Sequence, residues 1–140
     1  MKKITTTFFC SLILVAFTLF SCSKSNSSPT NSNPIVGLWI GTATYPPSSV
    51  SLYYSYDLRA DSTLLFQGLG GDGNTYYGAG KWSLSGSSFT ATYAGTNLSN
   101  DGVMLNVTAV YNSTTGALTG SQVVSTNADA IGTFSLNRIN

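Results

Sequence analysis

The stretch SLYYSYDLRADSTLLF, residues 51–66, contains two alternating segments joined by a short turn. In its first half, apolar and aromatic residues recur at every second position: Leu52, Tyr54, Tyr56 and Leu58. This is the period of a β-strand with one buried face. The residues ADS at 60–62 have the composition of a tight turn. The stretch therefore predicts an antiparallel hairpin with one apolar face.

The same pattern continues along the chain, and no window shows a helical period. Eight strands are predicted, over residues 35–44, 50–59, 63–68, 75–84, 88–94, 102–111, 117–125 and 130–139. One face of each strand is mainly apolar and the other mainly polar, as expected of an antiparallel sheet with one wet face. Short connections favour an all-β, eight-stranded antiparallel up-and-down barrel over the alternative, a two-sheet sandwich.

The N-terminal segment has the three parts of a bacterial signal sequence. Lys2 and Lys3 precede the apolar run FFCSLILVAFTLF, residues 8–20, which is shorter than the roughly 20 residues of a membrane span. The residues LFSC at 19–22 resemble the lipobox of bacterial lipoproteins. This resemblance implies a signal peptide over 1–21, cleavage before Cys22, and acylation of Cys22 with palmitate-type chains. The alternative is an ordinary signal peptide with a chance cysteine.

Residues 22–34 then form a linker of Ser, Asn and Pro that has too few apolar residues to fold, so we expect it to be disordered. The domain itself spans residues 35–140. We expect an anchor in the outer membrane of the cell envelope. No acidic cluster follows Cys22, which favours the periplasmic side over the cell surface.

The composition excludes several functions. Charged residues from Cys22 onward are few and scattered: Lys24, Arg59, Lys81, Arg138, Asp57, Asp61, Asp72, Asp101 and Asp129. Because phosphate binding needs a basic face, a nucleic-acid partner is not expected. The chain has no His and no Glu, and no cysteine after Cys22. We therefore expect no enzyme, no metal site and no cofactor.

A short motif at the start of the domain resembles a known family. Gly37-x-Trp39 on the first strand and Arg138 on the last are similar to the lipocalin-like (calycin) pattern. The likeness extends through GLWIGT (37–42), YDLRADSTLLF (56–66), GAGKWSLSGSSFTATY (78–93), LTGSQ (118–122) and GTFSLNRI (132–139). It implies a small lipocalin-like domain in which Trp39 closes one end and Arg138 packs across its ring. Strand alternation also places Arg138 on the inner face, in phase with Phe134 and Leu136.

This resemblance implies that the barrel binds a small hydrophobic or amphipathic ligand. The candidate binding residues are the aromatics of the predicted inner face: Tyr54, Tyr56, Phe66, Trp82, Phe89, Tyr93 and Tyr111. Alternatively these rings fill the core, and the barrel serves as a protein-interaction or envelope-assembly module. In that case Leu38, Ile40, Tyr53 and Tyr77, on the opposite face, are the contact candidates.

The other motifs are weaker. Asp57 and Asp61 are interpreted as an outward strand residue and a turn former rather than a catalytic pair. Lys81, beside Trp82, is predicted to point outward. The segments GGDGNT (70–75) and SNDG (99–102) lack the spaced carboxylates of a calcium loop. Asp61-Ser62-Thr63 resembles an O-glycosylation sequon known in some bacteria.

Overall fold

The computed structural model describes residues 33–95, 103–124 and 130–139. Its elements are all β-strands: β1 (Gly37–Thr44), β2 (Ser51–Leu58), β3 (Thr63–Leu69), β4 (Thr75–Ser85), β5 (Ser88–Gly95), β6 (Met104–Asn112), β7 (Ala117–Val124) and β8 (Ala130–Arg138). Each predicted strand corresponds to one of these, with ends that differ by a few residues.

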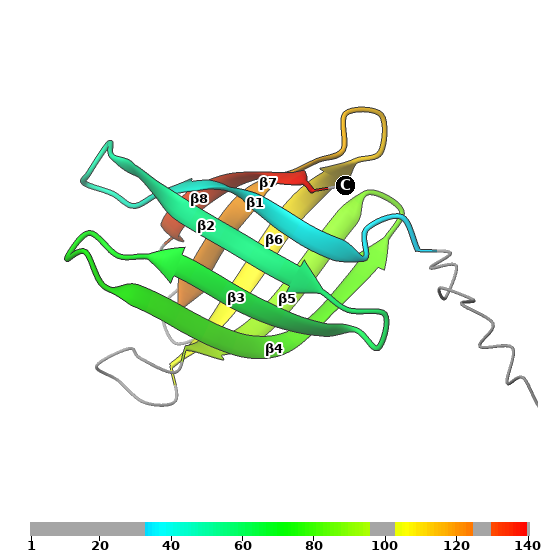
Figure 1. Ribbon diagram of the computed structural model, residues 1–140, viewed down its shortest axis with the longest axis horizontal. Helices are drawn as coiled ribbons and strands as arrows, with labels where there is room; N and C mark the ends of the chain where they lie inside the picture. Colours follow the sequence, from blue (N-terminus) through cyan, green and yellow to red (C-terminus); the bar gives the residue numbers. More distant parts are fainter. Residues whose placement is uncertain (1–32, 96–102, 125–129, 140) are drawn as a thin grey trace, which may run out of the picture. The chain divides into compact units, whose positions relative to one another are not determined.

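The strands form one closed barrel in which each strand pairs antiparallel with its neighbour in the sequence (Figure 1). β1 and β8 complete the closure, with Trp39 opposite Arg138 and Thr44 opposite Thr133. The predicted eight-stranded up-and-down barrel is confirmed, and the sandwich alternative is wrong. Closure satisfies the hydrogen bonds that the edges of an open sheet would leave unpaired.

The β2–β3 turn shows how the sequence sets the hairpins. The carboxylate of Asp61 accepts hydrogen bonds from the backbone N–H and the hydroxyl of Thr63, at 3.0 and 2.5 Å. Ser62 takes a left-handed conformation with φ 63°, and Arg59 N–H donates to Thr63 O at 2.9 Å. Asp61 is therefore a turn former, as expected for an Asx turn.

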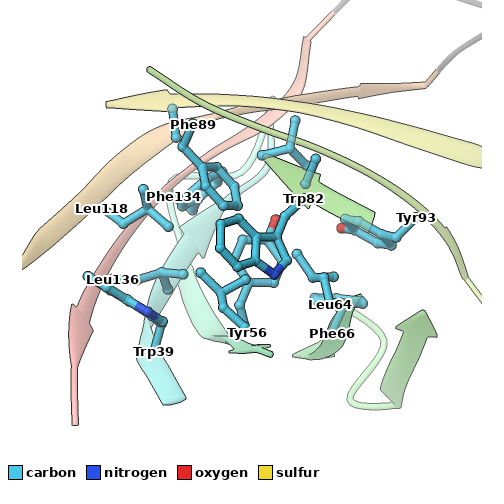
Figure 2. Close-up of a cluster of buried hydrophobic side chains, with 14 of the residues drawn as sticks. Trp39, Tyr56, Leu64, Phe66, Trp82, Phe89, Tyr93, Leu118, Phe134 and Leu136 are labelled. Carbon is cyan, nitrogen blue, oxygen red and sulfur yellow. The ribbon is translucent and has the colours of Figure 1, made fainter. Parts of the chain in front are cut away.

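The core lies inside the barrel and is rich in aromatic rings. Figure 2 shows side chains from several strands, including Trp39, Tyr56 and Trp82, pointing into one shared cluster. Trp39, Tyr54, Tyr56, Phe89 and Tyr93 are fully buried. Every buried side-chain N or O atom in the described residues has a hydrogen-bond partner, so the polar tips of these rings do not weaken the core.

The outer face of the barrel is mostly polar but also carries apolar side chains. Leu38, Tyr53 and Tyr77 are exposed and Ile40 is half-buried. Their predicted outward direction is confirmed. In the described part of the chain, no helix has the length and apolar character needed to cross a bilayer.

Candidate functional site

Trp39 fills the end of the barrel at which β1 begins, which we call the closed end. Its indole N–H donates to Ile35 O at 2.7 Å, and its ring meets Tyr111 edge-on with centroids 5.9 Å apart. Ile35 is itself fully buried, as are Leu58 and Leu118. The chain before β1 thus folds against Trp39, and this tryptophan has a structural position in the core.

Arg138 lies opposite the buried Trp39 in the register, as its phase predicts, but its side chain is exposed. Its packing across the Trp39 ring stays a prediction. Its guanidinium donates to Pro34 O at 2.9 Å and passes over Gly37, where an added Cβ would lie 3.3 Å from Nε. β8 ends at this residue, so its side chain can turn along the rim towards a backbone carbonyl and remain hydrated.

A cavity of about 560 Å³ lies at the opposite end of the barrel, which we call the open end. The β1–β2 and β3–β4 connections border this end, on the left in Figure 1. Its lining is mainly apolar and comes from strand ends and connections: Tyr45, Ser48, Val50, Leu52, Phe66, Gly68, Leu69, Gly70, Gly71, Asp72, Tyr76, Tyr93, Val103, Leu105, Gln122 and Val124. The volume is within the range of roughly 300–1,000 Å³ that is typical of small-molecule pockets.

A polar network lies at the floor of this cavity, centred on Gln122. The Gln122 carboxamide oxygen accepts hydrogen bonds from the hydroxyls of Tyr54 and Tyr93, at 2.5 and 2.7 Å. The Tyr54 hydroxyl lies 2.7 Å from that of Tyr56. On the cavity side, Gln122 Nε2 donates to the Tyr45 hydroxyl at 3.2 Å. The network therefore connects the buried core to the cavity wall.

The phenols of this network are neutral at physiological pH. Burial raises the pKa of Tyr54, Tyr56 and Tyr93 well above the ordinary tyrosine value, and it also raises the pKa of Tyr45. Desolvation has this effect because it disfavours the charged phenolate. The cavity floor thus offers neutral hydrogen-bonding groups and carries no charge of its own.

Asp72 lies at the mouth of the cavity, in the β3–β4 hairpin. Its carboxylate accepts hydrogen bonds from the Tyr76 hydroxyl at 2.7 Å and from the backbone N–H and the side chain of Asn74 at 3.0 and 2.8 Å. The bond from Tyr76, followed by those from Asn74, lowers the pKa of the Asp72 carboxyl. This group is therefore ionised at neutral pH and gives the mouth a negative charge.

The predicted binding aromatics fall into three positions. Phe66 and Tyr93 line the cavity. Tyr54 and Tyr56 are fully buried beside it and belong to the polar network. The remaining three are not among its lining residues: Trp82 and Phe89 lie in the core, and the half-buried Tyr111 packs against it.

Trp82 illustrates this structural role. Its indole N–H donates to Arg59 O at 3.1 Å, and its ring stacks on Phe89 with centroids 6.3 Å apart.

Two residues of the site were not predicted from the sequence: Tyr45, which follows β1 in a proline-rich connection, and Gln122, whose role was missed. The signal for Gln122 was present, because it is the one amide on the predicted inner face of its strand.

The charged candidates show no catalytic arrangement. Asp57 and Arg59 form an exposed ion pair at 3.1 Å, and Lys81 is exposed on β4. Over the described residues, no group of three His, Cys, Asp or Glu side chains could hold a metal ion. The predicted loop at 99–102, Cys22 and residues 23–32 of the linker lie outside the described residues. The last two linker residues are described: Asn33 accepts a hydrogen bond from Ile35 N–H and Pro34 O accepts one from Arg138. The sequon Asp61-Ser62-Thr63 is in an exposed turn, and its modification stays a prediction.

No protein-family model matches the chain, and no curated protein or solved structure is significantly similar to it. The fold and the site together define a closed eight-stranded antiparallel barrel with a cavity at one end.

Proposed function

We propose that this chain is a lipid-anchored, lipocalin-like binding protein that takes a small hydrophobic or amphipathic ligand into the open end of its barrel. The observation that carries the proposal is the cavity of about 560 Å³ with its mainly apolar lining. Such a pocket desolvates an apolar ligand, and a few polar groups in it orient the bound molecule. The proposal assigns no catalytic step to the chain.

The arrangement of the two ends supports a binding role. Trp39 and its neighbours pack the closed end, whereas the cavity occupies the open end. A barrel of eight strands has an interior that side chains nearly fill or that holds one small ligand. Gly68 and Gly70 lie in the cavity wall, where a Cβ would clash with the ring of Phe66 or Tyr76, respectively. Glycine at these positions therefore lets the two rings lie against the wall of the cavity.

The proposal is tested with a neutral apolar probe. N-phenylnaphthylamine fluoresces strongly when it leaves water, so its titration into the chain from residue 23 onward reports on the cavity. We expect a saturable increase in emission with one probe bound per protein. A signal that rises without saturation would show partition onto the surface and contradict the proposal.

The lipid anchor is tested by Cys22→Ser. Acylation of Cys22 would hold the chain on a membrane, because several acyl chains on one residue anchor durably. We expect the variant to leave the membrane fraction and to lose the mass of the lipid. Cys10→Ser is the matched control, since Cys10 lies in the segment predicted to be removed, and it should remain membrane-bound. Membrane retention of Cys22→Ser would contradict the anchor.

The second candidate is a protein-interaction or envelope-assembly module. It is favoured by exposed apolar side chains on the outer face of β1 and β3. Leu38 and Leu65, 42% and 38% exposed, are the register partners of Asp57 on the β2 strand between them. Absence of probe binding together with a folded barrel would favour this candidate.

A further inference from the structure

The distribution of positive charge bears on the kind of ligand that the cavity accepts. Arg59, Lys81 and Arg138 are the only Lys or Arg residues in the part of the chain that the structure describes. Arg59 pairs with Asp57, Lys81 lies on the outer wall, and Arg138 lies on the rim of the closed end. None of the three lines the cavity, so its described lining offers no cation to an anionic head group.

The mouth of the cavity carries a negative charge instead. Asp72 is the one charged residue among the described lining, and its carboxylate is held in place by Tyr76 and Asn74. A carboxylate ligand would have to lose its water near this like charge. Burial of an unpaired charge is costly, and a neighbouring charge of the same sign adds to that cost.

The polar network determines which hydrogen-bonding groups face the ligand. The three buried phenols have three protons to donate. All three find an acceptor when Tyr56 donates to Tyr54 while Tyr54 and Tyr93 both donate to the Gln122 oxygen. That oxygen then has no free lone pair. Gln122 Nε2 donates one proton to the Tyr45 hydroxyl, which keeps its own proton. The cavity therefore presents hydrogen-bond donors from Tyr45 and Gln122.

From these contacts we infer, as an extension of the proposed binding function, that the cavity selects electrically neutral amphiphiles over fatty-acid carboxylates. The preferred ligand has an apolar chain or ring and one neutral acceptor, such as an alcohol or carbonyl oxygen. Tyr45 and Gln122 bind that oxygen, the apolar walls cover the rest of the molecule, and Asp72 disfavours anions at the mouth.

The inference is tested with two probes of equal chain length, decanol and decanoate. Both are titrated at neutral pH and by calorimetry into the folded chain from residue 23 onward, which retains the whole closed barrel. Decanol is kept below its solubility limit and decanoate below its micellar concentration. We expect decanoate to bind at least about tenfold more weakly than decanol, because only decanoate has to bury a charge.

Two substitutions locate the selectivity. Tyr45→Phe keeps the ring but removes the hydroxyl, so it should weaken decanol binding about three- to tenfold. Its effect on decanol binding should exceed its effect on N-phenylnaphthylamine binding, because that probe has no alcohol or carbonyl oxygen to accept the Tyr45 proton. Tyr53→Phe, on the exposed outer face, is the matched control and should change neither. Asp72→Asn keeps the shape of the side chain and removes its charge, so it should strengthen decanoate binding relative to decanol binding.

The outcomes separate the inference from the proposed function. Decanoate binding as tight as decanol, or tighter, would overturn the inference and leave the binding function standing. The same holds if Tyr45→Phe and Tyr53→Phe have equal effects on decanol. If neither decanol, decanoate nor N-phenylnaphthylamine binds the folded barrel, the proposed function fails and the inference fails with it.

Discussion

Trp39→Ala is expected to lower the free energy of unfolding by about 3–5 kcal/mol, the range for truncating a large aromatic in a packed core. Trp39 is fully buried, donates to Ile35 O and contacts the ring of Tyr111. Its loss leaves a cavity at the closed end and removes the group against which the chain before β1 packs. A free energy of unfolding of about 5–15 kcal/mol is typical of a domain, so the expected loss is a large fraction of the total stability.

Urea unfolding followed by circular dichroism measures this effect. Arg138→Ala is the contrasting variant, because its exposed side chain makes one hydrogen bond to Pro34 O. It should change the free energy of unfolding by less than about 1 kcal/mol. Equal losses for the two variants would show that the arginine contributes to the closed end as the family resemblance implied. They would contradict the account in which Trp39, and not Arg138, stabilises the closed end.

Gln122→Leu is expected to lower the free energy of unfolding by about 2–3 kcal/mol. Leucine removes the oxygen that accepts from Tyr54 and Tyr93. Among the three phenols, the Tyr54 hydroxyl lies 2.7 Å from that of Tyr56 and 2.9 Å from that of Tyr93. These two contacts can take two of the three protons, so one buried donor loses its acceptor. A buried donor without an acceptor costs more than the bond itself is worth.

Gln67→Leu is the matched control for this substitution, because Gln67 is exposed on the outer face of β3. Its effect should stay within about 0.5 kcal/mol. The comparison uses the urea midpoints of both variants at an unchanged slope, so that the difference reflects stability. If both variants unfold at the wild-type midpoint, the network contributes nothing to the barrel.

The fold was predictable because the alternation in this chain is strong and its connections are short. Tyr54 and Tyr56 on β2, for example, share the buried face, while Tyr53, directly before Tyr54, is 39% exposed. Trp39 was also predicted to lie in the core. Strand period fixes which face a residue occupies, and that was sufficient for these positions.

The site was less predictable, because strand alternation gives the face on which a side chain lies but not its position along the barrel axis. Trp82 and Tyr93 share the inner face, but only Tyr93 reaches the cavity. Tyr45 lies in the connection after β1, so strand alternation does not predict which way its side chain points. Arg138 is the last residue of the last strand, where strand alternation no longer determines whether a side chain is buried. Both strand alternation and the family pattern placed Arg138 inward, but at the end of the barrel its side chain is exposed and reaches the Pro34 carbonyl.

The central claim is that the open end of the barrel holds the ligand, and a pair of matched substitutions tests it most directly. Val124→Trp places bulk in the cavity wall, whereas Val110→Trp places the same bulk on the outer face of β6, where Val110 is 58% exposed. Titration of N-phenylnaphthylamine into both folded variants is the measurement. The account predicts lost or much weakened binding for Val124→Trp and wild-type binding for Val110→Trp. Equal binding by the two variants would place the probe outside the cavity and contradict the account.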